Sequence, residues 1–196
     1  MKLVLASKNQ KKLVEMNEIL SHLGIQVCSE AEAGVDVEVE ETGTTFEENS
    51  LLKAEAVMEA SGMPAIADDS GLCVDTLGGA PGVYSARYGG EGLDDTGRYR
   101  LLLENMRGQT PRTAKFVSVI TCCFPNGDVI SARGECPGTI AFAPMGEGGF
   151  GYDPVFFVPP LKKTFAQLTA EEKNAISHRG KALEAFQVKL KEYLSK

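Results

Sequence analysis

Two adjacent aspartates, Asp68 and Asp69, follow a short apolar run at residues 64–67 and precede Ser70 and Gly71. Neighbouring carboxylates repel each other, so this pair either forms a solvated turn or lies around a cation. A turn closed by Asx hydrogen bonds is the simple structural interpretation. Mg²⁺ is commonly bound by one or two carboxylates together with the phosphate oxygens of a substrate. The two aspartates alone leave the turn and the metal site as equal alternatives.

Further acidic residues could share such a cation. Valine alternates with acidic residues over 35–40, which predicts a half-buried strand with one acidic face. Its candidate metal ligands are Glu38, Glu40 and the following Glu41. Glu47 and Glu48 open a helix after Thr45, where acidic residues suit the helix dipole, so a structural role is the stronger interpretation for them.

A polar segment joins the first predicted strand to the first predicted helix. It consists of Ser7, Lys8, Asn9, Gln10, Lys11 and Lys12. Backbone N–H groups at a helix start, with lysines nearby, form a natural binding site for phosphate. The segment lacks the glycines and the Gly-Lys-Ser/Thr ending of a Walker A loop. An exposed helix start with solvated lysines is the commoner structure and is favoured when this segment is taken alone.

Two late segments could bind a nucleobase. Phe150 and Tyr152 lie among glycines, where an aromatic ring offers a stacking surface, although a core aromatic beside a turn is the commoner case. His178 and Arg179 are cations near a helix start, and Gly180 inside a helix costs about 1 kcal/mol relative to alanine. Cations at a helix start and glycine inside a helix are both unfavourable locally, which indicates a ligand. A frayed first turn is the alternative. The four segments together match a nucleoside triphosphate.

The elements that must position these residues follow an α/β pattern. Strands are expected at 2–6, 25–28, 35–39, 64–67, 113–124 and 129–135, with further extended segments at 72–77 and 138–143. Helices are expected at 13–23, 45–62, 95–106 and 169–194. This order predicts a mixed sheet bent into two lobes with a cleft between them. Residues 1–196 would form one two-lobed domain, with a strand-rich lobe at about 112–145.

Composition limits the possible partners and location. The chain has 196 residues and a net charge of −7, with no basic run, which argues against a nucleic-acid polymer as the main partner. Its five cysteines form no CxxC pair, which favours reduced, buried thiols over disulfides or a zinc site. The N-terminal apolar run is too short for a signal peptide and no membrane-length span follows, so we expect a cytoplasmic protein that contacts no membrane.

Six motifs occur in order along the chain. They are Ser7-x-Asn9-x-x-Lys12, Thr45-Phe46-x-Glu48-Asn49, Ala67-Asp68-Asp69-Ser70-Gly71, Leu77-Gly78-Gly79-x-Pro81-Gly82, Phe150-Gly151-Tyr152-Asp153-Pro154 and Ser177-His178-Arg179. This set resembles the inosine/xanthosine triphosphate pyrophosphatases, from residue 2 to about 193. The resemblance implies a homodimer with an elongated, twisted sheet. It also implies Mg²⁺-dependent hydrolysis of ITP, dITP and XTP to the monophosphate and pyrophosphate, which keeps deaminated purines out of DNA and RNA.

The resemblance assigns a role to each candidate residue. Ser7 to Lys12 would bind the triphosphate, Glu40 and Asp69 would hold Mg²⁺, Asp69 would also be the general base, and Ser70 would contact the substrate. The base and a nearby phosphate would be surrounded by Phe150, Gly151, Tyr152, Asp153, Lys173, His178 and Arg179. Glu40 is chosen over its acidic neighbours because it precedes Glu41-Thr42-Gly43, as in the family pattern. Many relatives have glycine in place of Lys8, so Lys8 would either strain the loop, if the position needs positive φ, or add a phosphate contact.

The sequence also predicts selectivity for the purine base and leaves two rival functions to compare. His178 and Arg179 can donate to a 6-keto oxygen but not to the amino group of adenine, which predicts poor hydrolysis of ATP. A Maf-type pyrophosphatase is the nearest rival enzyme, but its N-terminal loop typically reads Ser-x-Ser-Pro-Arg-Arg. A non-catalytic nucleotide sensor is the rival from another class, and the acidic Asp68, Asp69 and Glu40 argue against it.

Overall fold

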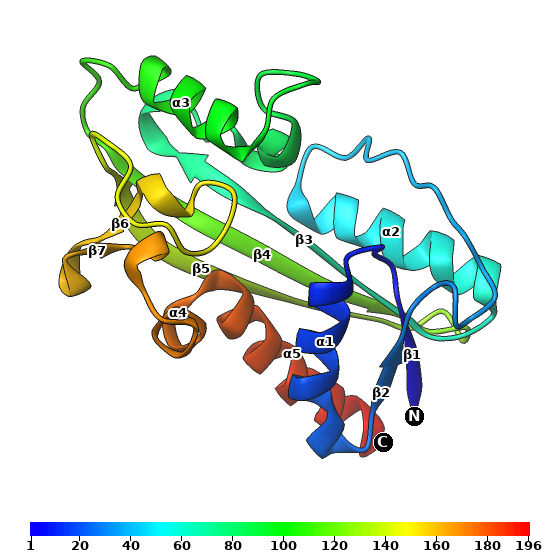
Figure 1. Cartoon of the computed structure of the whole chain (residues 1–196). Coiled ribbons are helices and arrows are strands. Elements are labelled where there is room, and N and C mark those ends of the chain that lie inside the picture. Colours follow the sequence, from blue (N-terminus) through cyan, green and yellow to red (C-terminus); the bar gives the residue numbers. More distant parts are fainter. The chain divides into compact units, whose positions relative to one another are not determined.

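The computed structural model describes all 196 residues and contains one seven-stranded sheet with helices packed on it (Figure 1). The strands are β1 (Lys2–Leu5), β2 (Gln26–Cys28), β3 (Ala65–Val74), β4 (Thr113–Cys123), β5 (Val129–Ile140), β6 (Phe156–Val158) and β7 (Lys163–Thr164). The helices are α1 (Gln10–Leu20), α2 (Phe46–Ser61), α3 (Asp95–Asn105), α4 (Ala170–Ile176) and α5 (His178–Leu194). The strand order is β2-β1-β3-β4-β5-β6-β7. Parallel pairs around β1 and antiparallel pairs around β6 confirm the predicted mixed α/β sheet.

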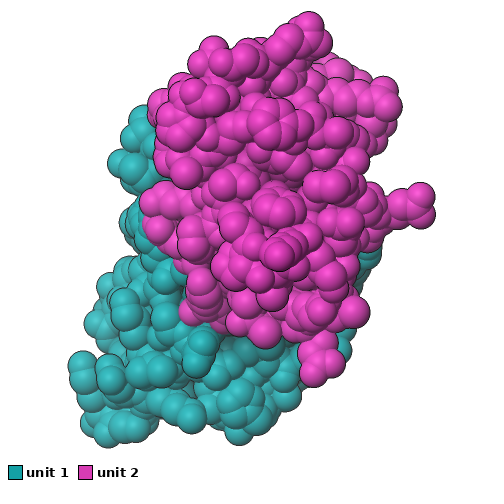
Figure 2. All heavy atoms as spheres, turned by 90° about the vertical axis from the view of Figure 1, so that its left-hand side faces the viewer, with its two compact units in different colours: residues 1–69, 118–134, 182–196 teal, residues 70–117, 135–181 magenta.

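The chain divides into two compact units, coloured separately in Figure 2. Unit 1 contains residues 1–69, 118–134 and 182–196, and unit 2 contains residues 70–117 and 135–181. Each unit has its own hydrophobic core. The predicted cleft and the boundaries of a strand-rich lobe stay predictions.

Unit 1 has an apolar core on each face of its part of the sheet. Side chains alternate between the faces of a strand, so Leu3, Leu5 and Ile66 pack with apolar residues of α1 and α5. Val4 and Ala67 pack on the other face, with apolar residues of α2. The next two residues of β3 continue this alternation, which places Asp68 on the α1 face and Asp69 on the α2 face.

Local signals place both ends of α2 as predicted. The Thr45 hydroxyl accepts the Glu48 N–H, and the Glu48 carboxylate accepts the Thr45 N–H, forming the expected capping box. The helix ends at Ser61 and is capped by Gly62, whose φ of 66° suits glycine. In α1 the Asn9 side chain caps the first turn. That helix ends at Leu20 and continues as a short 3₁₀ turn, which makes it shorter than predicted.

The structure differs from the prediction at two strands. Residues 35–39 form no strand, although the valines are half-buried and the acids between them are exposed, because this segment has no strand partner in the sheet. The apolar run at 64–67 does not end at the aspartates, because β3 continues through them to Val74. The aspartates therefore lie inside a ten-residue strand and are not a turn.

The predicted C-terminal helix is also broken. Its capping box at Thr169 and Glu172 is present, but α4 ends after seven residues. Ser177 is extended, with φ −65° and ψ 153°, and α5 begins directly after it. His178 and Arg179 therefore occupy the first turn of a new helix.

The cysteines agree with the prediction of reduced, mostly buried thiols. All five cysteines are free, and four of them are buried. Burial raises the pKa of the Cys123 thiol to about 11, which keeps it protonated at neutral pH. No helix combines the length and the apolar character needed to cross a membrane.

Candidate active site

The segment between β1 and α1 is held by its own side chains. The Ser7 hydroxyl accepts the Asn9 N–H at 3.2 Å, and the Asn9 side chain accepts the Lys11 N–H at 2.9 Å. These contacts fix the start of α1 while Lys8, Asn9, Gln10 and Lys11 stay exposed. The exposed amide and lysine groups can receive a phosphate. Lys8 is not strained, because Lys162 is the one non-glycine residue with positive φ.

Lys53 of α2 joins two acidic residues of unit 1. Its ammonium lies 3.0 Å from Asp69 Oδ1 and 3.1 Å from Glu41 Oε1, and it also donates to the Asp68 carbonyl oxygen at 2.9 Å. Burial alone would lower the pKa of Lys53, but the Asp69 and Glu41 carboxylates raise it above its usual value. The side chains of Lys53 and Asp69 are only 16% and 10% exposed, so this is a largely buried charge cluster.

Asp69 retains an unused oxygen in that cluster. Asp69 Oδ2 is buried and has no hydrogen-bond partner, whereas Oδ1 accepts from Lys53. Burial raises the pKa of the Asp69 carboxyl above its usual value, against the opposing effect of Lys53. A buried carboxylate oxygen without a partner is unfavourable unless a proton, a water molecule or a cation binds it. This oxygen can therefore bind a metal ion or accept a proton from water.

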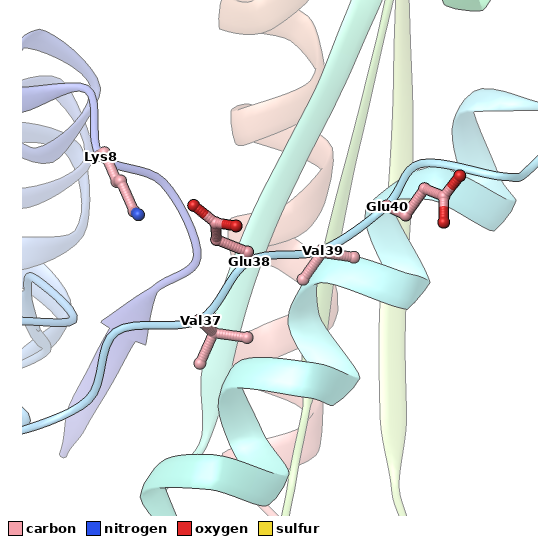
Figure 3. A pocket seen from close by; sticks show the side chains of 5 residues that line it. All are labelled: Lys8, Val37, Glu38, Val39 and Glu40. Carbon is pink, nitrogen blue, oxygen red and sulfur yellow. The ribbon is translucent and has the colours of Figure 1, made fainter.

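The acidic segment before α2 has two different surroundings. Glu40 is exposed, and it lines a pocket of about 580 Å³ with Lys8, Val37, Glu38 and Val39. In Figure 3 the Glu38 side chain extends toward Lys8, while the Glu40 carboxylate points away from them. Glu41 is the acid that shares Lys53 with Asp69. The fold thus brings Glu41, and not Glu40, to the lysine that contacts the candidate base.

A close contact fixes the position of this acidic segment on α2. The Gly43 N–H donates to Asn49 Oδ1 at 2.8 Å. A Cβ at Gly43 would lie 2.5 Å from the same oxygen and 2.7 Å from the Cβ of Glu48, so only glycine fits. The segment is therefore tied to the first turns of α2, the helix that carries Lys53.

In unit 2, Asp153 organises the glycine-rich loop. Its Oδ2 accepts the Phe150 N–H at 3.1 Å and the Lys173 ammonium at 2.6 Å. Burial raises the pKa of Asp153, while Lys173, the Phe150 N–H and Arg179 oppose the shift. The Gly151 N–H donates to Asp95 of α3 at 2.9 Å. Asp153 is only 4% exposed, so it fixes the loop and Lys173 from within the protein.

The two loop aromatics have different environments. The Phe150 side chain is 62% exposed, and the Lys173 ammonium lies 4.9 Å from its ring centroid. Tyr152 is buried, and its hydroxyl donates to the Ser85 carbonyl oxygen at 2.6 Å. Phe150 has the free surface that stacking on a flat base requires, whereas the Tyr152 ring is part of the unit 2 core.

The first turn of α5 is packed tightly. The His178 ring stacks on Phe116, with centroids 4.8 Å apart, and the Gly180 N–H donates to the Ser177 hydroxyl at 3.0 Å. A Cβ at Gly180 would lie 2.4 Å from the Asn174 carbonyl oxygen. The close approach of α4 and α5 is thus sufficient to explain Gly180. Ser70, the first residue of unit 2, is partly exposed on β3.

Comparison with known proteins shows the family. The model of the Ham1 family matches residues 3–189. The chain belongs to the Ham1 family. A protein of Desulforamulus reducens named dITP/XTP pyrophosphatase is 54% identical over 93% of this chain and 92% of its own. An Escherichia coli O157:H7 protein of the same name is 50% identical, over 93% and 94%. The structure of the Staphylococcus aureus Ham1 protein has a TM-score of 0.93 at 44% identity, covering 98% of this chain and 100% of its own.

The sequence motifs of this Ham1 protein missed Lys53, the cation that pairs with Glu41 and Asp69. The buried residues of α2 are Phe46, Asn49, Ser50, Ala54 and Val57. Lys53 falls on the same face by its helical spacing. A lysine within a buried helix face needs an acidic partner, and that pattern was available in the sequence.

Proposed function

We propose that the protein hydrolyses ITP, dITP and XTP to the monophosphate and pyrophosphate, with Mg²⁺ as cofactor. The observation that carries this proposal is the buried Asp69 carboxylate, which accepts from Lys53 through one oxygen and has no partner on the other. Such a group can hold a cation and accept a proton from water, as metal-assisted hydrolysis requires. The names of its relatives support the substrate class.

Asp69 is the proposed metal ligand and general base. Its buried Oδ2, which has no hydrogen-bond partner, is the atom proposed to face the cation and the attacking water. The second carboxylate is supplied by one of the adjacent Glu40 and Glu41, so the donor set matches the one or two carboxylates that Mg²⁺ usually takes. When bound, Mg²⁺ neutralises phosphate charge and polarises the α-phosphoryl group.

The remaining candidate residues bind the two ends of the nucleotide. The exposed amides and lysines of Ser7 to Lys12 bind the triphosphate and stabilise charge on the departing pyrophosphate. Phe150 stacks on the base, and Asp153 keeps Lys173 and the Phe150 loop in position. His178 and Arg179 donate to the 6-keto oxygen of the purine, which disfavours adenine. Ser70 contacts the substrate.

The central experiment compares pyrophosphate release from ITP, dITP, XTP, GTP and ATP in the presence of Mg²⁺. We expect hydrolysis of the first three, and equal rates with ATP and ITP would refute the role of His178 and Arg179. A Maf-type enzyme would prefer pyrimidine or modified nucleotides, and a nucleotide sensor would bind ITP without releasing pyrophosphate. Light scattering tests the expected homodimer, and fractionation of cells tests the expected cytoplasmic location.

Asp69→Asn tests the base directly. The variant keeps the shape of the side chain and leaves Glu41 as a carboxylate partner of Lys53, so it should still unfold cooperatively. It should lose kcat by about 10²- to 10⁴-fold. Near-normal kcat with ITP would overturn the role of Asp69. A fold that does not form would be visible as loss of cooperative unfolding.

Glu40→Gln and Glu41→Gln form a matched pair for the metal. Both changes remove one negative charge from adjacent positions, so they differ only in the surroundings described above. The variant of the true ligand should raise the Mg²⁺ concentration for half-maximal activity by about 10-fold or more, and its neighbour should not. Unchanged Mg²⁺ dependence in both variants would exclude this pair of glutamates as metal ligands.

A further inference from the structure

Asp68 is a buried carboxylate that the proposed mechanism does not use. The residue is 3% exposed, and its side chain accepts from the Lys12 ammonium and, at 3.4 Å, from the Ser118 hydroxyl. Its backbone carbonyl also accepts from Lys53 at 2.9 Å. Helices α1 and α2 and strand β4 therefore all contact this one residue of β3, within unit 1.

Asp68 and Asp69 differ in what their side-chain oxygens bind. Both oxygens of Asp68 accept hydrogen bonds, one from Lys12 and one from Ser118. Asp69 has one bonded oxygen and one buried oxygen without a partner. Strand alternation directs the two side chains to opposite faces of the sheet. The two aspartates therefore have separate lysine partners, and only Asp69 has a side-chain oxygen without a hydrogen bond.

The start of α1 explains why Lys12 needs this partner. The first turn contains no acidic residue, and Lys12 follows Lys11 near the positive end of the helix dipole. The Lys12 side chain is only 22% exposed, so water compensates its charge only in part. A buried carboxylate likewise requires a cation or several hydrogen bonds. The contact between Asp68 and Lys12 satisfies both groups.

We propose that Asp68 is a positioning residue that holds the Lys12 ammonium at the start of α1, and that it is not a metal ligand. The contribution to phosphate binding rests on the proposed function, because Lys12 is one of the phosphate-binding residues. The contact itself does not depend on that function. An ammonium has three donors, so Lys12 can stay on Asp68 while it donates to a phosphate oxygen.

The first test needs no nucleotide and no metal. The full chain is labelled with limiting acetic anhydride, and mass spectrometry measures acetylation of Lys12 relative to the exposed Lys11. Asp68→Asn should raise this ratio at least about 10-fold, roughly the value of one charge-assisted hydrogen bond. The control Glu104→Gln, which removes an exposed pair with Arg107, should leave the ratio unchanged. An unchanged ratio in Asp68→Asn would overturn the proposal.

A second variant covers the case in which Asp68→Asn does not fold. Ser118→Ala removes the longer contact of 3.4 Å and keeps the Asp68 charge. It should loosen the carboxylate and raise the labelling ratio by a smaller factor than the aspartate variant does. No rise in Ser118→Ala, measured on protein that unfolds cooperatively, would then count against the proposal.

The kinetic test separates positioning from metal binding. With ITP, Asp68→Asn should lower kcat/KM by about 10- to 100-fold, as is typical when a supporting partner is lost. The double variant with Lys12→Met should be no more than about 3-fold below Lys12→Met alone, because Asp68 acts through Lys12. The Mg²⁺ concentration for half-maximal activity should stay unchanged in Asp68→Asn.

Independent losses that multiply in the double variant, or a Mg²⁺ requirement raised about 10-fold in Asp68→Asn, would overturn the positioning role. If the wild-type protein does not hydrolyse ITP, the proposed function fails. The labelling result would still decide whether Asp68 holds Lys12, so the two failures are distinguishable.

Discussion

Gly180→Ala should destabilise the protein, although alanine is the better helix former. Replacing glycine inside a helix normally gains up to about 1 kcal/mol. Here the new Cβ would lie 2.4 Å from the Asn174 carbonyl oxygen, and 3.4 Å is the lower limit of ordinary contact. The backbone of α4 or α5 must therefore shift by about 1 Å, and overpacking of this kind typically costs about 1–3 kcal/mol. The net effect should be a loss of up to about 2 kcal/mol.

Gly97→Ala is the matched control for this prediction. Gly97 is also in the first turns of a helix of unit 2, and its Cβ would meet two side chains, Leu93 at 3.0 Å and the Asp94 carboxylate at 3.2 Å, but no backbone carbonyl. A side chain can move where a backbone carbonyl cannot, so this variant should be neutral or slightly stabilised. The difference between the two variants isolates the cost of the backbone contact, about 1–3 kcal/mol.

Urea denaturation measures both variants. The free energy of unfolding of each should be compared with that of the wild type at an unchanged m value, which keeps the comparison two-state. If Gly180→Ala is stabilised as much as Gly97→Ala, the close-contact argument is wrong. Gly180 would then need another explanation, and the ligand that its position first suggested would return as the leading one.

The other predictions concern the loop aromatics and one helix cap. Phe150→Ala should raise KM for ITP by roughly 5- to 150-fold at an unchanged unfolding midpoint, since base stacking is worth about 1–3 kcal/mol. Tyr152→Phe should instead lower stability by about 1 kcal/mol and leave KM nearly unchanged. The opposite pattern would show that Tyr152 stacks on the base and Phe150 does not. The N–H and hydroxyl of Thr44, with the Thr45 N–H, lower the pKa of Glu48. The ionised Glu48 carboxylate therefore stabilises the folded protein above the unfolded pKa, and this stabilisation is lost as pH falls through the lower, folded pKa. The unfolding midpoint of Glu48→Gln should therefore lie below that of the wild type at pH 7 and approach it near pH 3, and an equal gap at both values would contradict this.

Local signals predicted the elements whose ends depend on nearby residues. The start of α2 after Thr45 uses contacts within a few residues, so the sequence contains all that decides it. The strand predicted at 35–39 was wrong. The alternation of valines and acids there matches alternating half-buried and exposed side chains, but this pattern does not require a neighbouring strand. The prediction of one long C-terminal helix was wrong. The apolar residues keep their helical spacing on both sides of Ser177, but the Ser177 backbone is extended and divides the helix in two.

The candidate site was predicted unevenly for the same reason. Motifs singled out Asp69 and the segment from Ser7 to Lys12 as candidates. They missed Lys53, whose ion pairs reach residues 12 and 16 positions away. The choice among neighbouring glutamates also needed the fold, because the acidic segment has no regular structure that fixes its register. Gly180 looked functional in the sequence and is explained by packing.

The geometry of β3 explains how two adjacent aspartates can be buried. In a turn both carboxylates would face the same solvent or the same cation, and their repulsion would have to be balanced there. Inside β3 their side chains leave on opposite faces, so each can have its own lysine, Lys12 for Asp68 and Lys53 for Asp69. Exchanging Asp68 for a neutral residue should then alter the lysine on the α1 face and leave the Asp69 cluster intact. That separation is the reason two carboxylates can be neighbours in a buried strand, each beside its own ammonium group.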